Sequence, residues 1–372
     1  MRLDYKLKVL STLLHGASSR LGLKGKNYIE KPVILEFMIT SRCDCRCIMC
    51  NIWKKNPDGD LTLDEIRTLL ADPTLSDLRT ITLAGGEPFK RKEILDICEL
   101  INANCRNLIQ LYLSTNGFDC KAIEEKVTQM LKIMKNIKRL RIAVSFDHIG
   151  EIHDKIRGRN GIHKNALELV DRLKRIDDSR LTVQGNFTIA PYNINDIWRI
   201  YEYFKDIGLK MFWFPIMTSD NFFENEEKSE NYAFHKEEKI RLEEFIAFLR
   251  RNDTSMPDYY YYTGLKNSLH SGSRAFPCSG GSKFLMINSE GDVYPCYIIP
   301  KKYKMGSIRE RSLSDIWNSE EAQQIRKIIL NNPTCAGCIQ WYDGYALSYS
   351  LKVFSGLVLA HPFRVMNHLV KK

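Results

Sequence analysis

The chain has 372 residues, of which 44% are hydrophobic and 27% are charged, and this composition is typical of a folded globular protein rather than a disordered one. The formal net charge of +10 is concentrated in residues 1–31 and 351–372. Because the chain between these basic ends is nearly neutral, it does not have the charge pattern of a surface that binds a nucleic-acid backbone, and no nucleic-acid partner is expected.

Residues 1–31 form a basic extension in which leucines (Leu3, Leu7, Leu10 and Leu14) recur at helical spacing. Such a helix could lie on anionic lipid, or it could pack over the open end of the main domain. Residues 346–372 form a similar basic, apolar tail. No apolar run is long enough to span a bilayer, and no cleavable signal peptide is evident. We therefore expect a cytoplasmic protein, with peripheral contact to the inner membrane face through its ends as an open alternative.

Residues 32–234 contain six short β-rich runs that alternate with helical patterns. The runs are Val33–Thr40, Leu78–Ala84, Leu108–Ser114, Leu140–Phe146, Leu181–Ile189 and Met211–Met217. A capping box of Thr62 with Glu65 starts the first helix, and others are predicted over 91–104, 121–136, 163–177 and 195–207, the last with Asn195 as its N-cap. Repeated βα units predict an α/β fold built on a parallel sheet.

A polar stretch around 224–230 separates this unit from the rest of the chain. Residues 235–273 hold a predicted helix over 235–251 and the aromatic run Tyr259–Tyr262, which could line a substrate cavity but more often packs a core or an interface. Residues 274–345 form a cysteine-bearing module, in which Ser314 is predicted to cap a helix that ends near Leu330.

Eleven cysteines without a secretion signal favour metal-binding thiolates in a reducing compartment over disulfides. Directly after the first β-rich run, Cys43, Cys47 and Cys50 have the spacing C-x3-C-x2-C, and Cys45 falls outside this pattern. Three thiolates on one loop can hold three corners of a [4Fe–4S] cube and leave the fourth iron open. The alternative for three close cysteines is a zinc knuckle.

Polar motifs follow several of the predicted strands. Gly85-Gly86-Glu87-Pro88 ends the second, and Ser114 with Asn116 ends the third. The carboxyl ends of strands in parallel barrels meet at one face, where ligands bind, so these side chains are expected to converge near the cysteines. The corresponding residues of the fourth and fifth strands are Ser145, Asp147, Arg157 and Asn186.

This combination of motifs resembles the radical S-adenosylmethionine (radical SAM) superfamily. The resemblance implies a partial (β/α)6 barrel in which Cys43, Cys47 and Cys50 hold a [4Fe–4S] cluster whose open iron binds S-adenosylmethionine. It also implies that the reduced cluster cleaves S-adenosylmethionine to methionine and a 5′-deoxyadenosyl radical that abstracts hydrogen from a substrate. The cofactor-binding positions that it implies are Gly85, Gly86, Glu87, Pro88, Ser114, Asn116, Ser145, Asp147, Arg157 and Asn186.

The second cysteine set consists of Cys278, Cys296, Cys335 and Cys338. Four thiolates suit either zinc or a fully ligated iron–sulfur cluster. The runs Gly291–Cys296 and Ser312–Trp317 resemble the SPASM/twitch module, which implies that these cysteines hold an auxiliary [4Fe–4S] cluster. Trp341–Tyr345 stands where a complete SPASM domain supplies further cysteines, so one auxiliary cluster in a shortened module is expected.

A cluster with four protein ligands suits electron transfer, which favours a small-molecule or sugar oxidation. The alternatives are a peptide or protein maturase, an enzyme acting on a lipid or lipid-linked glycan, and a zinc-stabilised binding protein without catalysis. The expected partners are the substrate and a reductase such as flavodoxin or ferredoxin. No side chain is assigned as a catalytic base.

Overall fold

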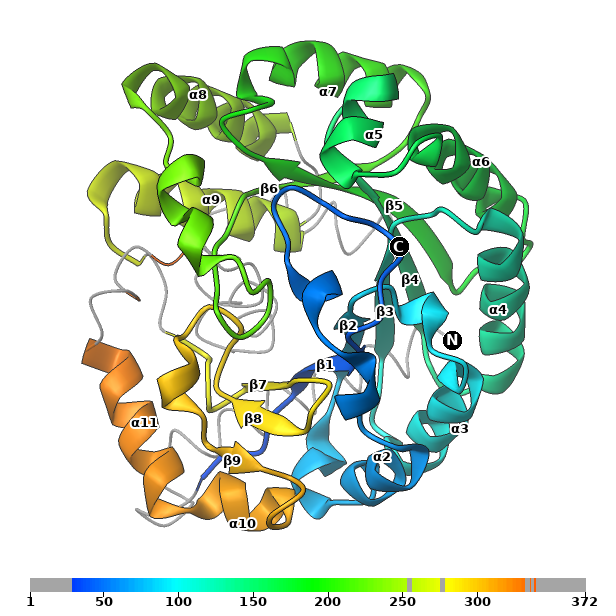
Figure 1. Ribbon diagram of the computed structural model, residues 1–372, viewed down its shortest axis with the longest axis vertical. Coiled ribbons are helices and arrows are strands. Elements are labelled where there is room, and N and C mark those ends of the chain that lie inside the picture. The colour runs from blue at the N-terminus through cyan, green and yellow to red at the C-terminus, as the bar shows by residue number, and fades with distance from the viewer. Residues whose placement is uncertain (1–28, 253–255, 275–277, 332–334, 336–337, 339–372) are drawn as a thin grey trace.

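The computed structural model describes residues 29–252, 256–274, 278–331, 335 and 338. In this part of the chain the strands form one sheet in the order β6-β5-β4-β3-β2-β1-β7-β8-β9. Strands β1 to β6 are parallel to their neighbours, and helices α2 to α7 follow one another around the outside of them (Figure 1). The predicted partial (β/α)6 barrel is confirmed.

The barrel strands lie within a few residues of the predicted runs. Met38 of β1 is the register partner of Ala84, which lines the pocket at the strand ends, so the alternation of a strand places Glu36 on this same inward face of the barrel. The six strands are β1 (Ile34–Thr40), β2 (Thr80–Gly85), β3 (Gln110–Thr115), β4 (Arg139–Phe146), β5 (Leu181–Ile189) and β6 (Met211–Pro215).

The outer helices are α2 (Leu63–Leu70), α3 (Ile94–Asn104), α4 (Cys120–Ile133), α5 (Gly150–Arg157), α6 (Ile162–Lys174) and α7 (Ile197–Asp206). The predicted capping box is present, because Glu65 N donates to Thr62 Oγ1 and Thr62 N donates to Glu65 Oε2. The prediction for Asn195 was wrong: this residue lies inside a 3-10 turn, and Asp196 is the N-cap of α7. Helix α5 was not predicted, since it has only eight residues and buries only His153 and Ile156.

The second unit continues the barrel sheet. Strand β7 (Phe284–Ile287) pairs in parallel with β1, and β8 (Asp292–Tyr294) and β9 (Gly306–Ser307) follow antiparallel (Figure 1). The helices of this half are α8 (Lys236–Asn252), α9 (Met256–Ser271), α10 (Leu313–Asn318) and α11 (Glu320–Asn331). The aromatic run Tyr259–Tyr262 lies in α9, with all four rings buried.

Ser312, rather than the predicted Ser314, caps the first helix of the module. The Ser312 hydroxyl accepts from Asp315 N at 3.1 Å, whereas the Ser314 hydroxyl donates to Asp72 at 2.7 Å. The predicted single helix is divided in two at Ser319. Short 3-10 turns complete the described elements: η1 (Ile52–Lys54), η2 (Pro57–Gly59), η3 (Pro73–Asp77), η4 (Pro88–Lys90), η5 (Ile194–Asp196), η6 (Glu226–Tyr232) and η7 (Lys301–Tyr303).

No helix in the described ranges is both long enough and apolar enough to cross a membrane. The basic segments 1–28 and 346–372, and the run Trp341–Tyr345, lie outside the described residues. Membrane contact through the ends, and the shortening of the module after Cys338, therefore remain predictions.

Candidate functional site

A pocket lies at the carboxyl ends of the barrel strands, beside the loop that follows β1. We call this loop, Ser41–Cys50, the cysteine loop. Pro88 and Asp147 are not among its lining residues, because Pro88 is buried at the start of η4 and Asp147 is buried against Arg157. All the other predicted residues of the catalytic site line it together. These are Cys43, Cys47, Cys50, Gly85, Gly86, Glu87, Ser114, Asn116, Ser145, Arg157 and Asn186.

Gly85 and Gly86 allow the start of the cysteine loop to cross the end of β2 in direct contact. Gly86 N donates to Thr40 O, and Glu87 N donates to Arg42 O, each at 2.8 Å. A Cβ placed on Gly86 would lie 2.3 Å from Arg42 O, and one on Gly85 would lie 2.1 Å from Thr40 O. Gly85 also has a φ of 123°, which favours glycine. Both positions therefore require glycine, and the pair fixes the cysteine loop against the pocket.

The Glu87 carboxylate holds the end of β3 in place. It accepts from Asn116 N at 2.7 Å, Thr115 Oγ1 at 2.9 Å and Phe89 N at 3.2 Å. Burial raises the pKa of Glu87 to about 7, although these three donors act in the opposite direction. Asn116 Nδ2 in turn donates to Asp44 Oδ1 at 2.8 Å. The ends of β2 and β3 are thus tied to each other and to the cysteine loop.

Arg157, at the end of α5, joins a buried acid to a cysteine. Its Nε lies 2.6 Å from Asp147 Oδ2, and its Nη1 lies 3.8 Å from Cys47 Sγ. The hydrogen bond from Cys45 lowers the pKa of Cys47 to about 7, with a contribution from Arg157 and against the effect of burial. This environment favours the thiolate of Cys47, which is the form that ligates iron.

Three polar side chains line the pocket from β3, β4 and β5. The hydroxyls of Ser114 and Ser145 make no hydrogen bond to any described residue, so they are available to a bound molecule. Asn186 Nδ2 donates to Tyr112 Oη at 2.6 Å, and Asn186 Oδ1 accepts from Gln184 at 3.1 Å. Asn186 therefore connects the pocket to polar side chains deeper in the barrel.

Cys45 also lines the pocket, although it falls outside the C-x3-C-x2-C spacing. It is 1% exposed, and its side chain is hydrogen-bonded to both Cys43 and Cys47, which raises its pKa. No three His, Cys, Asp or Glu side chains of the described residues already surround a common metal position. The three spaced cysteines nevertheless lie on one loop and face one pocket, and a set of three thiols suits three corners of an iron–sulfur cube.

The second cysteine set forms two close pairs, Cys278 with Cys296 at the ends of the β7–β8 hairpin and Cys335 with Cys338. A Cβ placed on Gly280 would lie 3.3 Å from Cys278 Sγ and 3.7 Å from Cys296 Cβ, so these two cysteines flank this glycine. Arg274 Nη2 donates to Cys335 O at 2.8 Å, and Cys338 N donates to the same carbonyl at 3.3 Å. A set of four thiols suits a fully ligated iron–sulfur cluster, and it also suits zinc.

Glu36 is a candidate functional residue that the sequence reasoning missed. It is 8% exposed, faces the barrel interior from β1, and is hydrogen-bonded to Thr82, its register partner on β2. Within the described chain no cation pairs with Glu36, and burial raises its pKa to about 8. A buried carboxyl without a counter-charge is costly and therefore marks a functional position. The available signal was an acid inside the apolar run 33–40.

Comparisons with known proteins agree with this arrangement. Residues 37–204 match the family model of the radical SAM superfamily, and residues 278–339 match SPASM, an iron–sulfur cluster-binding domain. The chain is 25% identical over 340 residues to an AdoMet-dependent heme synthase from Methanosarcina barkeri, a match that covers 82% of this chain and 91% of the relative. It is also 25% identical over 348 residues to a cysteine-type anaerobic sulfatase-maturating enzyme from Clostridium novyi, with 86% of each covered.

Solved structures show the same fold. The structure of native anSMEcpe with bound AdoMet and Cp18Cys peptide aligns with a TM-score of 0.57 at 15% identity. The alignment covers 91% of this chain and 99% of that one, so it includes both the barrel and the cysteine-bearing module.

Proposed function

Because this chain belongs to the radical SAM superfamily and carries a SPASM domain, we propose that Cys43, Cys47 and Cys50 hold the [4Fe–4S] cluster at which S-adenosylmethionine is cleaved. The observation that carries this proposal is the single pocket in which these cysteines meet motif residues from the ends of β2, β3, β4 and β5. When bound, the reduced cluster supplies the electron that cleaves S-adenosylmethionine and yields the radical that takes hydrogen from the substrate.

The protein's own residues bind and orient the cofactor in this proposal. Ser114 and Ser145 offer hydroxyls that have no partner among the described residues, and the Arg157 guanidinium offers a positive charge to a carboxylate. Pro88 and Asp147 act indirectly, since Pro88 starts the turn that follows Glu87 and Asp147 holds Arg157. The full set of proposed cofactor-binding positions is Gly85, Gly86, Glu87, Pro88, Ser114, Asn116, Ser145, Asp147, Arg157 and Asn186.

Cys278, Cys296, Cys335 and Cys338 hold one auxiliary [4Fe–4S] cluster in our proposal. The SPASM match spans all four of these positions, which supports the assignment. Four protein ligands leave no open iron, so the cluster serves in electron transfer rather than in substrate activation.

The substrate that we favour is a small polar molecule that undergoes oxidation. Polar side chains in register inside the barrel, Glu36, Thr82 and Tyr112, support a substrate with hydrogen-bonding groups below the pocket. The similarity to a heme synthase over most of both chains also supports a small molecule. Peptide maturation is the second candidate, because the match to the sulfatase-maturating relative covers a similar share of both chains.

Two further alternatives have direct tests. An enzyme acting on a lipid-linked glycan through basic ends would float with anionic liposomes, and absence of flotation would remove this alternative. A zinc-stabilised binding protein would contain zinc in place of iron at both cysteine sets and would not turn over S-adenosylmethionine.

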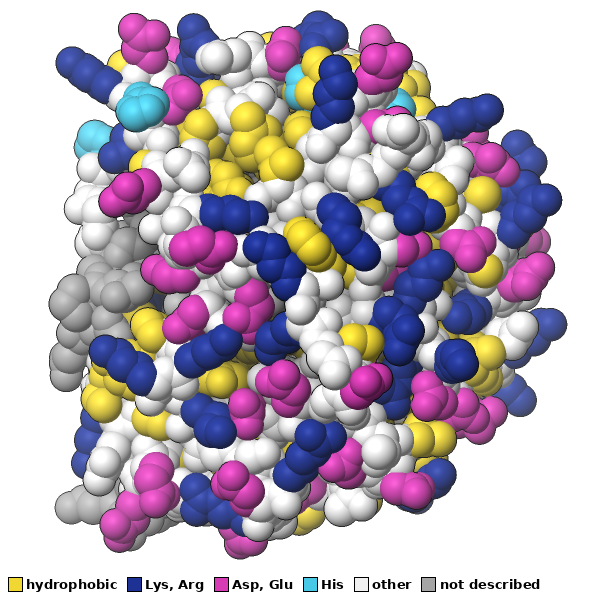
Figure 2. Space-filling model, in the orientation of Figure 1, with side chains coloured by type: hydrophobic (Ala, Val, Ile, Leu, Met, Phe, Trp, Pro, Cys, Tyr) yellow, Lys and Arg dark blue, Asp and Glu magenta, His cyan; other side chains and the backbone are white. Residues whose placement is uncertain are grey.

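A reductase such as flavodoxin or ferredoxin is the proposed electron donor. The cysteine loop reaches the surface at Ile48, which is 43% exposed, and Arg42, Arg46 and Lys54 are exposed around it. Figure 2 shows Lys and Arg side chains spread over the middle of one face, interspersed with Asp and Glu. Basic side chains near the cluster loop would attract an acidic donor.

The test is anaerobic purification and reconstitution, followed by measurement of iron, sulfide and dithionite-driven release of 5′-deoxyadenosine. About eight irons per chain are expected, falling to about four when Cys43, Cys47 and Cys50 are replaced by alanine, with loss of 5′-deoxyadenosine. Zinc in place of iron, or an intact cluster that releases no 5′-deoxyadenosine, would refute the proposal. Cell-derived small molecules and cell-derived peptides are then added in separate reactions. The fraction that increases 5′-deoxyadenosine release identifies the substrate class.

A further inference from the structure

The segment Ser219–Asn225, which follows β6 and which we call the bridge segment, is a compact turn closed by its own hydrogen bonds. Asn225 N donates to Ser219 O at 3.0 Å, and Ser219 N donates to Asn225 Oδ1 at 2.8 Å. The Ser219 hydroxyl accepts from Phe222 N and Phe223 N at 3.1 and 2.9 Å. These four hydrogen bonds fix the shape of the turn, so the segment can act as a rigid connector.

One side of the bridge segment holds the cysteine loop. Asn225, which is fully buried, donates from Nδ2 to Met49 O at 2.7 Å. Asn51 N donates to Phe223 O at 2.8 Å. Met49 and Asn51 are the neighbours of Cys50, so the backbone on both sides of this cysteine is fixed by the bridge segment.

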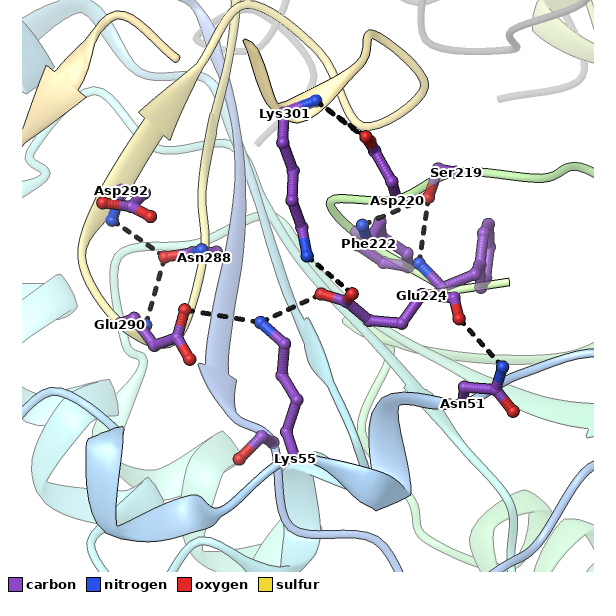
Figure 3. A network of polar contacts seen from close by, with 12 residues as sticks. Asn51, Lys55, Ser219, Asp220, Phe222, Glu224, Asn288, Glu290, Asp292 and Lys301 are labelled. Atoms are coloured by element: carbon purple, nitrogen blue, oxygen red, sulfur yellow. Dashed lines mark hydrogen bonds and ion pairs between the residues drawn. The ribbon is translucent and has the colours of Figure 1, made fainter. Parts of the chain in front are cut away.

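The other side of the bridge segment holds the SPASM module. Asn221, which is 1% exposed, donates from Nδ2 to Cys296 O at 3.2 Å and to Ile299 O at 2.8 Å. The Asp220 carboxylate accepts from Lys301 N at 3.0 Å (Figure 3). A single seven-residue segment thus contacts the backbone of Cys296 and the residues beside Cys50.

Glu224 joins the two sides through its side chain. Lys55 Nζ, from the turn after the cysteine loop, lies 3.0 Å from its carboxylate, and Lys301 Nζ, from the module, lies 2.7 Å from it (Figure 3). Lys55 also pairs with Glu290 at 3.4 Å. Glu224 has a φ of 54°, and among the described residues no other non-glycine residue has a positive φ. Such a conformation is strained for a residue with a side chain and persists where the surroundings enforce it.

The aromatic residues of the bridge segment form part of the pocket wall. Phe222 and Phe223 both line the pocket, as Cys50 does. The Phe222 ring also packs against Tyr297 of the module, with a centroid distance of 5.2 Å. Movement of Glu224 would therefore displace the wall of the pocket.

We propose that Glu224 is a positioning residue through which the SPASM module sets the affinity of the pocket for S-adenosylmethionine. Its ion pairs with Lys55 and Lys301 hold Phe222 and Phe223 at the wall of the pocket. The inference rests on the proposed function of the pocket. Coupling of this kind is reciprocal, so bound S-adenosylmethionine also tightens the contact between the module and the barrel.

The experiment is a titration of the reconstituted, dithionite-reduced protein with S-adenosylmethionine, followed by the change in the electron paramagnetic resonance spectrum of the catalytic cluster. Iron content and melting temperature are measured on the same samples. The variants are Glu224→Gln, Lys301→Met and the double variant. Lys301→Met keeps the backbone N–H that Asp220 accepts from. The matched controls are Glu226→Gln and Lys302→Met, two exposed neighbours that form no ion pair with described residues.

Glu224→Gln and Lys301→Met should each weaken S-adenosylmethionine binding by roughly three- to tenfold at unchanged iron content, because each removes a partly buried ion pair. The double variant should bind S-adenosylmethionine no more weakly than Glu224→Gln does, since both changes break the same ion pair. Wild-type affinity in Glu224→Gln, or fully additive effects in the double variant, would overturn the inference. Absence of any spectral response in the wild type would instead refute the proposed function of the pocket.

Discussion

Arg157 and Asp147 form an ion pair of 2.6 Å in which the carboxylate has no exposure to solvent. The same guanidinium reaches Cys47 Sγ at 3.8 Å, so the charge that compensates a buried acid also lies beside a proposed cluster ligand. In the proposed function, stability and cofactor binding are therefore connected through one side chain.

Replacing Arg157 by methionine should lower the melting temperature, because Asp147 is then buried without a counter-charge, at a cost of about 3 to 5 kcal/mol. The double variant Arg157→Met with Asp147→Asn should recover most of this loss but should still bind S-adenosylmethionine weakly. Calorimetry and S-adenosylmethionine titration measure the two effects separately. Recovery of both properties in the double variant would show that Arg157 has no role towards the cofactor.

Gly86→Ala should prevent incorporation of the catalytic cluster, because the new Cβ would lie 2.3 Å from Arg42 O and would displace the cysteine loop. The control is Gly161→Ala, where φ is 75° and no atom lies within 4 Å of the added Cβ. That variant introduces backbone strain without a clash, at a cost of about 1 to 2 kcal/mol. Iron content after reconstitution measures the difference, and equal iron in both variants would contradict the role given to Gly86.

Cys45→Ala should retain iron and 5′-deoxyadenosine release, whereas single alanine variants of Cys43, Cys47 and Cys50 should lose the catalytic cluster. The expectation rests on the C-x3-C-x2-C spacing, which Cys45 does not fit although its thiol lies in the same pocket. The electron paramagnetic resonance spectrum of the reduced protein reports the cluster directly. Loss of the cluster in Cys45→Ala with retention in Cys43→Ala would mean that the ligand set has to be reassigned.

The buried Glu36 carboxyl is expected to make the stability of the protein depend on pH. Its folded-state pKa of about 8 lies above its ordinary value of 4.5, so the folded protein binds more protons than the unfolded chain between these values. The contribution of Glu36 to stability is therefore most favourable below pH 4.5 and declines as pH rises to 8, by an amount on the order of 4 to 5 kcal/mol.

Glu36→Gln does not titrate, so its melting temperature should match the wild type near pH 5 and exceed it near pH 8. Calorimetry at the two pH values measures this change. Glu151→Gln, at an exposed position, is the control and should behave as the wild type at both. A constant difference between Glu36→Gln and the wild type across this range would mean that the Glu36 carboxyl is not protonated in the folded protein.

The barrel and its pocket could be predicted because their signals are local. Apolar alternation in runs such as 181–189 fixes a strand, and motifs at strand ends must meet when the strands are parallel. The pairing of β7 with β1 could not be predicted, since Phe284–Ile287 is a four-residue apolar run whose partner lies about 250 residues earlier in the chain. No local pattern specifies such a partner.

Contacts between distant polar residues account for the other differences. Ser312 and Ser314 are both suitable caps, and the contact of Ser314 with Asp72 decides between them. Asn221 and Asn225 lie in a polar stretch without a recognisable motif. Their side-chain amides nevertheless donate hydrogen bonds to the backbone carbonyls of Cys296 and Met49. Side-chain bonds to distant backbone groups follow only from the assembled fold.

Strand β1 has neighbours on both of its edges, β2 on one and β7 on the other. The ladder of hydrogen bonds to β7 occupies the edge that a closed barrel would need for joining its first strand to its last. The module is consequently part of the frame of the barrel, and its separation from β1 would require breaking a strand pair. In the proposed function, an electron that passes between the two clusters would therefore move within one continuous frame rather than between two separately hinged domains.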